Sequence, residues 1–201
     1  VEGVLGQYRI VKKLGEGGMG AVYLAEHTLL GRRAAVKVLQ PNLSSNQDIV
    51  QRFFNEARAA TAIADPGIVQ IFDFDKEGDR YYLAMELIEG RSLSAWRDAW
   101  RARGQMPPRQ EVQRLFDQLC AGVEAAHRVT VPGPIVHRDL KPENILLTER
   151  RGESDVVKVV DFGIAKMLVH AAPGEDPISR MGTVFGTPHY IAPEQASGQP
   201  V

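Results

Sequence analysis

Three side chains able to support acid–base, charge-neutralising and metal-binding chemistry stand close together in the segment IVHRDLKPEN, residues 135–144. They are the carboxyl group of Asp139, the amine of Lys141 and the carboxamide of Asn144. Pro142, which has no backbone N–H, prevents a regular helix through them. We therefore expect a short loop that holds these three groups together at a reactive site.

Glycines are concentrated in a second segment, GEGGMG at residues 15–20. Gly15, Gly17 and Gly20 follow a G-x-G-x-x-G pattern, in which a backbone without Cβ atoms can turn sharply and approach phosphate oxygens. Residues 21–24 read as a strand, whereas a dinucleotide-binding loop continues into a helix. No Gly-Lys-Ser/Thr follows, so the segment is not a P-loop. The pattern alone also fits a Gly-rich hairpin turn.

A lysine and a glutamate occupy positions that favour a buried ion pair. Lys37 lies in the strand-like run AAVKVL, where it shares one face with Ala35 and Leu39, although a solvent-facing lysine is the alternative. Glu56 lies on the apolar face of a helix predicted over residues 44–64. The apolar positions of that helix are Ile49, Phe53, Ala57, Ala60 and Ile63. Because a buried carboxylate needs a partner, we predict that Glu56 pairs with Lys37, with small Ala35 leaving room for a flat ligand.

These residues must be positioned by a sheet-rich part followed by a mainly helical part. Strands are expected within residues 8–39 and again in IVQIFDF and YYLAMELI, on either side of the helix at 44–64. Further on, helices are predicted over 92–103 and 109–128, followed by a hairpin made of NILL and DVVKVV. Residues 163–194 are rich in Gly, Pro, Ser and Thr and read as a long functional loop.

The composition is that of an ordinary globular chain and excludes several classes of function. The 201 residues are 44% hydrophobic and 24% charged, and the net charge of −1 provides no basic field for nucleic acid or an anionic membrane. No apolar run is long enough to span a bilayer, and no signal-peptide pattern is present. The single cysteine, Cys120, excludes an internal disulfide and a multi-thiolate metal site, and fits a cytoplasmic setting. We interpret it as a core residue on an apolar helical stripe with Val112, Leu115, Phe116, Leu119 and Val123.

Five motifs appear in a fixed order along the chain: GEGGMGAV, AAVKVL, HRDLKPEN, Asp-Phe-Gly at 161–163 and Ala-Pro-Glu at 192–194. On these motifs the chain resembles, over essentially its whole length, the bacterial eukaryotic-like (Hanks-type) serine/threonine protein kinases. The resemblance implies an α+β bilobal fold in which residues 1–89 form an N-terminal lobe, a five-stranded antiparallel sheet with one C-helix. Residues 90–201 would form a partial, mainly helical C-terminal lobe, joined to the first near Glu86–Gly90.

The resemblance also implies transfer of the γ-phosphoryl group of ATP to Ser or Thr hydroxyls of proteins, with a role for each reactive residue. Asp139 would orient the acceptor hydroxyl and accept its proton, and Lys141 would neutralise charge on the migrating group. Lys37, held by Glu56, would bind the α- and β-phosphates. Thr187 would contact Asp139 and Lys141 from across the cleft.

Magnesium would be held by Asn144 and Asp161, because Mg²⁺ prefers oxygen ligands, with Mn²⁺ as the alternative ion. Met85 would guard the back pocket of the nucleotide site. His137 is interpreted as a structural residue that supports the loop beside Phe162, rather than as an acid–base group.

Adenine would lie between Val22, Ala35 and Leu146. Its hydrogen bonds would come from the backbone carbonyl of Glu86 and the backbone amide of Ile88. The complete nucleotide-binding set implied by the resemblance is Leu14, Gly15, Glu16, Gly17, Gly18, Gly20, Val22, Ala35, Lys37, Met85, Glu86, Ile88, Leu146 and Asp161.

Acceptor choice and regulation are also implied. Lys141 and the segment GTPHYIAPE favour Ser and Thr over Tyr acceptors. Arg138 would pair with a phosphorylated hydroxyl of the 163–194 loop and order that loop. Thr183 is preferred to Ser179 as the site of this autophosphorylation, which a homodimer would carry out in trans.

The chain departs from the family's usual pattern in three extended segments, RVTVPGP, TERRGESD and WRDAWRARGQ, none of which touches a motif residue. Both ends, at Val1 and Val201, read as cuts in a longer polypeptide, and Glu194 lacks the arginine partner that the family places further along. We therefore expect the 201 residues alone to be marginally stable and a poor catalyst. A parent protein tethered to a membrane outside this region is compatible with a cytoplasmic kinase domain.

Two rival functions are weighed against a protein kinase. A pseudokinase or scaffold would bind nucleotide or partners without chemistry, and the intact set Lys37, Glu56, Asp139, Asn144 and Asp161 disfavours it. A small-molecule phosphotransferase of related fold is disfavoured by the segments APE and GTPHY, which suit peptide acceptors. Protein substrates are the expected partners.

Overall fold

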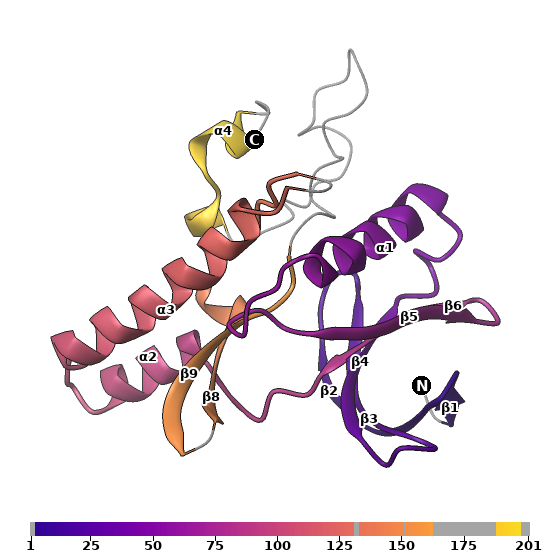
Figure 1. Ribbon diagram of the computed structural model, residues 1–201, viewed down its shortest axis with the longest axis horizontal. Helices are drawn as coiled ribbons and strands as arrows, with labels where there is room; N and C mark the ends of the chain where they lie inside the picture. The colour runs from indigo at the N-terminus through magenta and orange to yellow at the C-terminus, as the bar shows by residue number, and fades with distance from the viewer. Residues whose placement is uncertain (1–2, 131–132, 151, 163–187, 198–201) are drawn as a thin grey trace.

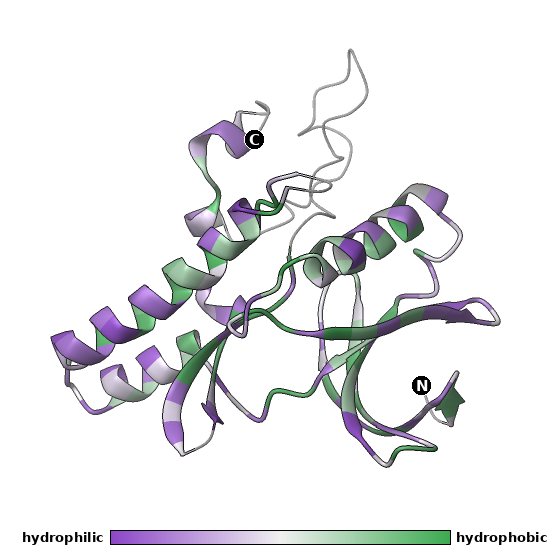
Figure 2. Ribbon diagram, viewed as in Figure 1, coloured by the Kyte–Doolittle hydropathy of each residue, from purple (hydrophilic) through white to green (hydrophobic). Residues whose placement is uncertain are grey.

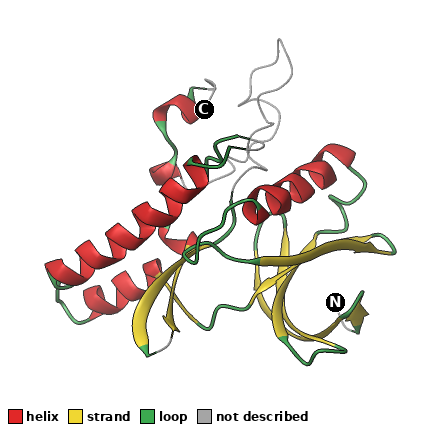
Figure 3. Ribbon diagram, in the orientation of Figure 1, coloured by secondary structure: helices red, strands yellow, loops and turns green. Residues whose placement is uncertain are grey.

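The computed structural model of the chain describes residues 3–130, 133–150, 152–162 and 188–197. Within them, a curled six-stranded sheet with one helix lies beside a second part made of two long helices and a three-stranded sheet (Figure 1). Figure 3 shows the same division, with the larger sheet and its helix on one side and the helices of the second part on the other. In the described chain no helix is long and apolar enough to cross a membrane.

The larger sheet is antiparallel throughout, with the strand order β1-β2-β3-β4-β6-β5. Its strands are β1 (Val4–Leu5), β2 (Tyr8–Glu16), β3 (Gly20–His27), β4 (Arg33–Leu39), β5 (Ile71–Glu77) and β6 (Arg80–Glu86). The predicted five strands are present, and the prediction was one strand short. The missing strand is β1, whose two residues pair with Arg9 and Tyr8 of β2, too short a run to show an alternating pattern.

Helix α1 (Gln47–Thr61) connects β4 to β5 and packs on the larger sheet. Its start is capped by Asn46, whose Oδ1 accepts a hydrogen bond from the backbone N–H of Ile49. The predicted apolar face is confirmed, because the side chains of this face are buried against Leu39 and Leu83 or against the second part of the molecule. The buried positions of this face are Phe53, Ala57, Ala60 and Ile63.

The second part begins at the end of the larger sheet. Strand β7 (Gly90–Ser92) leads into α2 (Leu93–Ala102), where Ser92 Oγ caps the helix by accepting from the N–H of Ala95. Helix α3 (Arg109–His127) follows, starting directly after Pro108.

The remaining elements are short. They are the 3₁₀ helix η1 (Pro142–Asn144), β8 (Ile145–Arg150), β9 (Glu153–Val159), the 3₁₀ helix η3 (Pro188–Tyr190) and α4 (Pro193–Ala196). Strands β7, β8 and β9 form the smaller sheet, and the hairpin expected from NILL and DVVKVV is β8–β9.

One hydrophobic cluster joins the two parts. Ile68, which lies between α1 and β5, packs in the same cluster as Trp96, Leu115, Val157 and Phe162. A parallel bridge between Ile68 and Val159 adds backbone contact at the same place. The position of β9 relative to the larger sheet is therefore set by both packing and hydrogen bonds.

The interpretation of Cys120 as a core residue was wrong, because Cys120 is exposed. Helix α3 buries a row that contains Leu115, Gly122 and Ala126, so that side of the helix faces the core. Val112 and Phe116 are 44% and 59% exposed, and with Cys120 they form a row at a spacing of four on another side of the helix. Figure 2 shows green and purple residues alternating along α3. The predicted apolar stripe of α3 was therefore wider than the side of the helix that the described elements bury.

Candidate active site

The loop around Asp139 brings the three predicted polar side chains together. Nδ2 of Asn144 donates hydrogen bonds to the backbone oxygen of Asp139 at 2.9 Å and to its Oδ2 at 3.2 Å. Nζ of Lys141 lies 3.5 Å from the same Oδ2. The 3₁₀ turn that starts at Pro142 makes this possible, since it places Asn144 back over the loop. The convergence predicted from the segment IVHRDLKPEN is therefore present.

His137 supports the Asp139 loop beside Phe162, as predicted. Its ring is buried and lies 4.6 Å, centroid to centroid, from the ring of Phe162. Nε2–H donates to the carbonyl oxygen of Val160 at 3.0 Å, and Nδ1 accepts from the N–H of Asp139 at 3.3 Å. Burial lowers the pKa of His137, although the Val160 carbonyl and the nearby carboxylates of Asp139 and Asp161 oppose that shift. A neutral imidazole with this tautomer satisfies both hydrogen bonds.

Two non-glycine residues of the site have left-handed backbone conformations. Arg138 has φ of 60° and Asp161 has φ of 55°. Such conformations are costly for residues with a Cβ and are concentrated at functional loops. Gln195, from α4, donates through Nε2 to the backbone oxygen of Arg138 at 3.1 Å and so helps to hold that loop.

Lys37 and Asp161 form the second charged pair of the site. Nζ of Lys37, on β4, lies 2.7 Å from Oδ1 of Asp161, which follows β9. The lysine side chain is 11% exposed and that of the aspartate 41% exposed. Burial acts to raise the pKa of Asp161, but the ammonium of Lys37, with smaller contributions from His137 and Lys141, lowers it below its usual value. The carboxylate is therefore ionised and available to a cation.

Backbone hydrogen bonds connect these two pairs. The N–H of Val160 donates to the carbonyl oxygen of Asn144 at 3.0 Å, and the carbonyl oxygen of Val160 accepts from His137. Val160 immediately precedes Asp161, so hydrogen bonds from both the N–H and the carbonyl of one residue fix the end of β9 against the Asp139 loop. Lys37, Asp161 and the Asp139 loop thus lie around one site.

The residues present fit a magnesium ion. Asp161 offers carboxylate oxygens, and the hydrogen bonds of Asn144 to Asp139 use its nitrogen Nδ2 rather than its oxygen Oδ1. Among the described residues, no group of three or more His, Cys, Asp or Glu side chains could hold a metal ion by itself. Mg²⁺ is commonly bound by one or two protein oxygens with phosphate and water completing its shell, which is what this donor set allows.

An apolar cluster lies next to the charged pair. Ala35, Val69 and Met85 are buried there, with five partly buried residues around them: Val22, Ile71, Leu87, Ile88 and Val160. Ala35 stands opposite Met85 in the β4–β6 register. A small cavity of about 20 Å³ behind Met85 is lined by Lys37 and Phe162 as well. Leu146, on β8, is half-buried. Val69, Ile71 and Met85 of this cluster line the same cavity as Lys37 and Asp161.

The predicted glycine segment caps the β2–β3 hairpin. The N–H groups of Gly17 and Gly20 each donate to the other residue's carbonyl oxygen, at 2.8 and 3.3 Å. A Cβ at Gly20 would overlap the carbonyl oxygen of Val38, whereas a Cβ at Gly15 or Gly17 would meet no atom within 4 Å. Gly20 is therefore required by packing against β4, and Gly15 and Gly17 leave open space above the sheet.

Several predicted residues lie outside the described part of the structure. They are Thr187, Thr183, Ser179 and the side chain of Glu56, although the backbone of Glu56 belongs to α1. The predicted Lys37–Glu56 pair thus stays a prediction.

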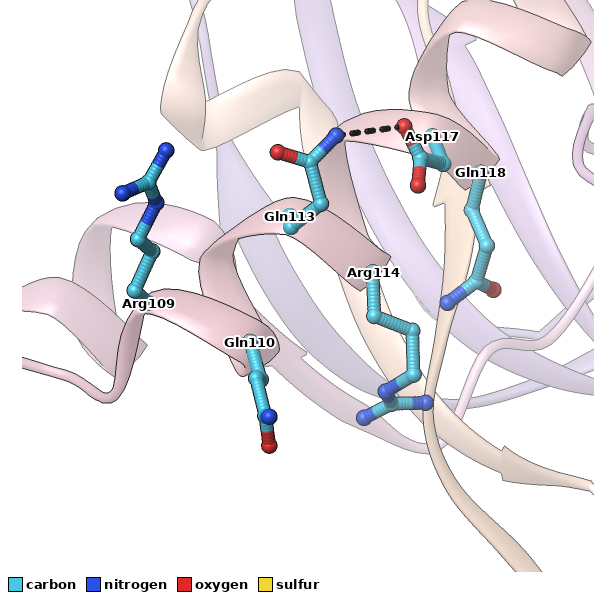
Figure 4. A pocket seen from close by; sticks show the side chains of 6 residues that line it. All are labelled: Arg109, Gln110, Gln113, Arg114, Asp117 and Gln118. Atoms are coloured by element: carbon cyan, nitrogen blue, oxygen red, sulfur yellow. Dashed lines mark hydrogen bonds between the residues drawn. The ribbon is translucent and has the colours of Figure 1, made fainter.

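A larger hollow, of about 480 Å³, lies away from this site on the surface of α3. Figure 4 shows its lining, with Gln113 hydrogen-bonded to Asp117. The residues that line it are Arg109, Gln110, Gln113, Arg114, Asp117 and Gln118. None of the predicted site residues belongs to it.

Sequence reasoning missed part of the apolar cluster. Val69, Ile71, Leu87 and Val160 were not predicted as members of the site, although all four lie within the predicted strand runs IVQIFDF, YYLAMELI and DVVKVV. Lys158 was also missed, since a lysine in the run DVVKVV reads as a solvent-facing residue, yet it is only 4% exposed.

The fold and the grouped lysine, aspartate and asparagine side chains have the arrangement that the motifs predicted for the protein-kinase class. A family model described as "Protein kinase domain" matches residues 8–201. The chain belongs to the protein kinase family, as the resemblance of its motifs implied, and its fold is the bilobal α+β fold of that family.

Curated relatives are bacterial enzymes. The chain is 46% identical over 196 residues to "Serine/threonine-protein kinase Pkn1" of Myxococcus xanthus, covering 98% of this chain and 26% of that protein. It is 37% identical over 195 residues to "Serine/threonine-protein kinase PrkC" of Bacillus subtilis, covering 97% and 28%. The chain therefore spans about a quarter of the length of the curated relatives it matches.

A solved structure supports the fold. The kinase domain of Mycobacterium tuberculosis PknI superposes with a TM-score of 0.72 at 26% identity, covering 100% of this chain and 69% of that one.

Proposed function

We propose that this chain carries the ATP-binding and catalytic residues of a serine/threonine protein kinase, which transfers the γ-phosphoryl group of ATP to Ser or Thr hydroxyls of proteins. The observation that carries the proposal is the convergence of two charged clusters. One is the Lys37–Asp161 pair at 2.7 Å, and the other is the Asp139, Lys141 and Asn144 loop. Val160 joins them through hydrogen bonds to Asn144 and His137.

Each charged group has a task that matches its position. The ammonium of Lys37, which lines the small cavity beside the apolar cluster, neutralises charge on the α- and β-phosphates of a nucleotide whose adenine lies between Val22, Ala35 and Leu146. Asp139 orients the acceptor hydroxyl and accepts its proton. Its carboxylate is held in place by Asn144, so little reorganisation is needed when the hydroxyl arrives.

Lys141 lies on the acceptor side of the site, beside Asp139. An ammonium there neutralises charge on the phosphoryl group as it moves toward the hydroxyl, which favours a Ser or Thr acceptor. Magnesium held by Asp161 and Asn144 would supply further charge neutralisation on the phosphates, and Mn²⁺ is the alternative ion.

We also propose that Arg138 is the receptor for a phosphate on the segment before Ala-Pro-Glu. Arg138 is partly buried, and burial lowers its pKa from a very high value, so the guanidinium stays charged in a poorly hydrated place. A phosphorylated Thr183, in preference to Ser179, would pair with it, with a homodimer as the phosphorylating species. Mass spectrometry of the protein after incubation with ATP tests this, and phosphate on neither residue would contradict it.

The division into lobes at 1–89 and 90–201 is proposed on the same grounds. Strand β6 ends at Glu86 and β7 begins at Gly90, leaving three residues as the connection. In that connection, Leu87 and Ile88 pack against the apolar cluster of Ala35, Val69 and Met85.

Phosphorylation of myelin basic protein tests the proposed function. The full-length protein and its Asp139→Asn variant are compared with radiolabelled ATP and magnesium, with Asp98→Asn, an exposed aspartate on α2, as the matched control. The proposal predicts incorporation that is lost in Asp139→Asn by roughly 10²-fold or more and kept in the control. Nucleotide binding without any incorporation would favour the pseudokinase alternative instead.

A further inference from the structure

A buried ion pair connects the last residue of β6 with β9, between the two parts of the molecule. Nζ of Lys158, on β9, is 2.6 Å from Oε2 of Glu86, the last residue of β6. The lysine side chain is 5% exposed and the glutamate side chain 31% exposed. Nζ also lies 3.5 Å from the carbonyl oxygen of Ile68. A lysine this deeply buried requires its partner, so the pair constrains position far more than a surface ion pair does.

The lysine is the fixed member of the pair. Its neighbour Val159 donates through its N–H to Gly67 at 2.7 Å and accepts from Val69 at 3.0 Å, and the next residue, Val160, donates to Asn144. Lys158 also stands opposite Leu146 in the β8–β9 register. Backbone bonds on several sides therefore hold this strand in place, independently of the lysine side chain.

The glutamate is the member whose position matters to a ligand. Glu86 follows Met85 directly and begins the connection to β7, and its N–H donates to the carbonyl oxygen of Gln70 at 2.8 Å. After Glu86 the strand pairing stops, since Ala34–Glu86 is the final pair of the β4–β6 register. The side-chain contact with Lys158 thus adds a second restraint at the last paired residue of β6, directly before the connection to β7.

We propose that Lys158 is a positioning residue for the purine: its ion pair with Glu86 holds the end of β6 so that the Glu86 carbonyl and the Ile88 amide meet the adenine edge. The inference rests on the proposed function, in which those two backbone groups bind adenine. A binding site that is already ordered loses less conformational freedom when the ligand arrives, which strengthens binding. Because hydrogen bonding at this edge distinguishes adenine from guanine, the ion pair contributes to base selectivity as well as to affinity.

The test compares base selectivity in the parent chain and in Lys158→Met. Methionine keeps much of the buried stem, and the remaining Glu86 carboxylate reaches solvent and can be hydrated. Dissociation constants for ADP and GDP with magnesium are measured by competition against a fluorescent ADP analogue. We expect the constant for ADP to rise about fivefold, that for GDP to change less than about twofold, and the ADP preference to fall accordingly. The double variant Lys158→Met/Glu86→Gln should bind ADP no more weakly than Lys158→Met, and Lys76→Met, an exposed lysine on β5, should match the parent.

Other outcomes would overturn the inference. An unchanged ADP constant in Lys158→Met contradicts it, and an equal loss for ADP and GDP shows a merely structural role. If Lys158→Met does not fold, Glu86→Gln is judged by the same ADP to GDP ratio. A parent chain that binds no ADP removes the proposed function and this inference together, whereas a parent and variant that bind ADP equally well remove this inference alone.

Discussion

Nζ of Lys37 and Oδ1 of Asp161 lie 2.7 Å apart, although 124 positions separate the two residues in the chain. The first belongs to the larger sheet and the second follows the last strand of the smaller sheet. Their contact spans the junction where a phosphate chain would lie, with the Asp139 loop on its other side. A nucleotide phosphate bound by Lys37 would therefore lie next to Asp161, the proposed magnesium ligand.

Replacing Lys37 by methionine should abolish most of the phosphoryl transfer. The variant loses the ammonium that neutralises phosphate charge and leaves Asp161 without its 2.7 Å partner. We expect incorporation into myelin basic protein to fall by roughly 10²-fold or more. Lys12→Met, an exposed lysine of β2, is the matched control and should retain the parent's rate. Equal rates in Lys37→Met and the parent would exclude a role for this amine.

Gly20→Ala should destabilise the protein, because the added methyl group would overlap the carbonyl oxygen of Val38 on the neighbouring strand. One strand must shift, and overpacking of this kind costs about 1–3 kcal/mol. Chemical denaturation measures the change. Gly15→Ala provides the comparison, since a Cβ at that glycine would meet no atom within 4 Å. A Gly20→Ala variant as stable as Gly15→Ala would show that the hairpin is not packed as described.

Stability should decline as the pH falls below the ordinary histidine pKa of 6.5, in part because of His137. The folded pKa of this buried ring is lowered, so below 6.5 the unfolded chain binds a proton that the folded chain excludes. The contribution is complete above 6.5 and is lost as the pH falls toward the folded pKa. Urea denaturation between pH 5 and 7.5 measures it, with His137→Gln as the comparison.

The parent should lose stability more steeply over that interval than His137→Gln, which has no ring to protonate. Parallel curves for the two proteins would mean that the ring is hydrated or already charged in the folded state.

Structural features that depend on residues close together in the sequence were mostly predicted correctly. The segment IVHRDLKPEN indicated a polar loop because Pro142 excludes a helix, and the helix at 44–64 followed from its apolar spacing, with Phe53 and Ala57 buried as expected. The two-residue strand β1 could not be predicted, because it exists only by pairing with β2.

Features that depend on tertiary contacts were harder to predict. The exposure of Cys120 is set by which elements cover α3, and an apolar stripe does not say how wide that cover is. Lys158 looks like a surface residue within DVVKVV, and only the position of Glu86 on a distant strand explains why it is buried. Charged residues inside apolar runs therefore merit a search for a partner elsewhere in the chain.

The central claim is that Lys37, Asp161 and the Asp139 loop surround one magnesium-bound nucleotide, and the magnesium dependence of ADP binding tests it most directly. Calorimetry of the parent with ADP, in magnesium and in chelator, should show affinity about tenfold higher with magnesium, because the ion and the nucleotide stabilise each other's binding. In Asp161→Asn that dependence should shrink to about twofold or less. ADP affinity that ignores magnesium in the parent, or a variant with the parent's full magnesium dependence, would contradict the account.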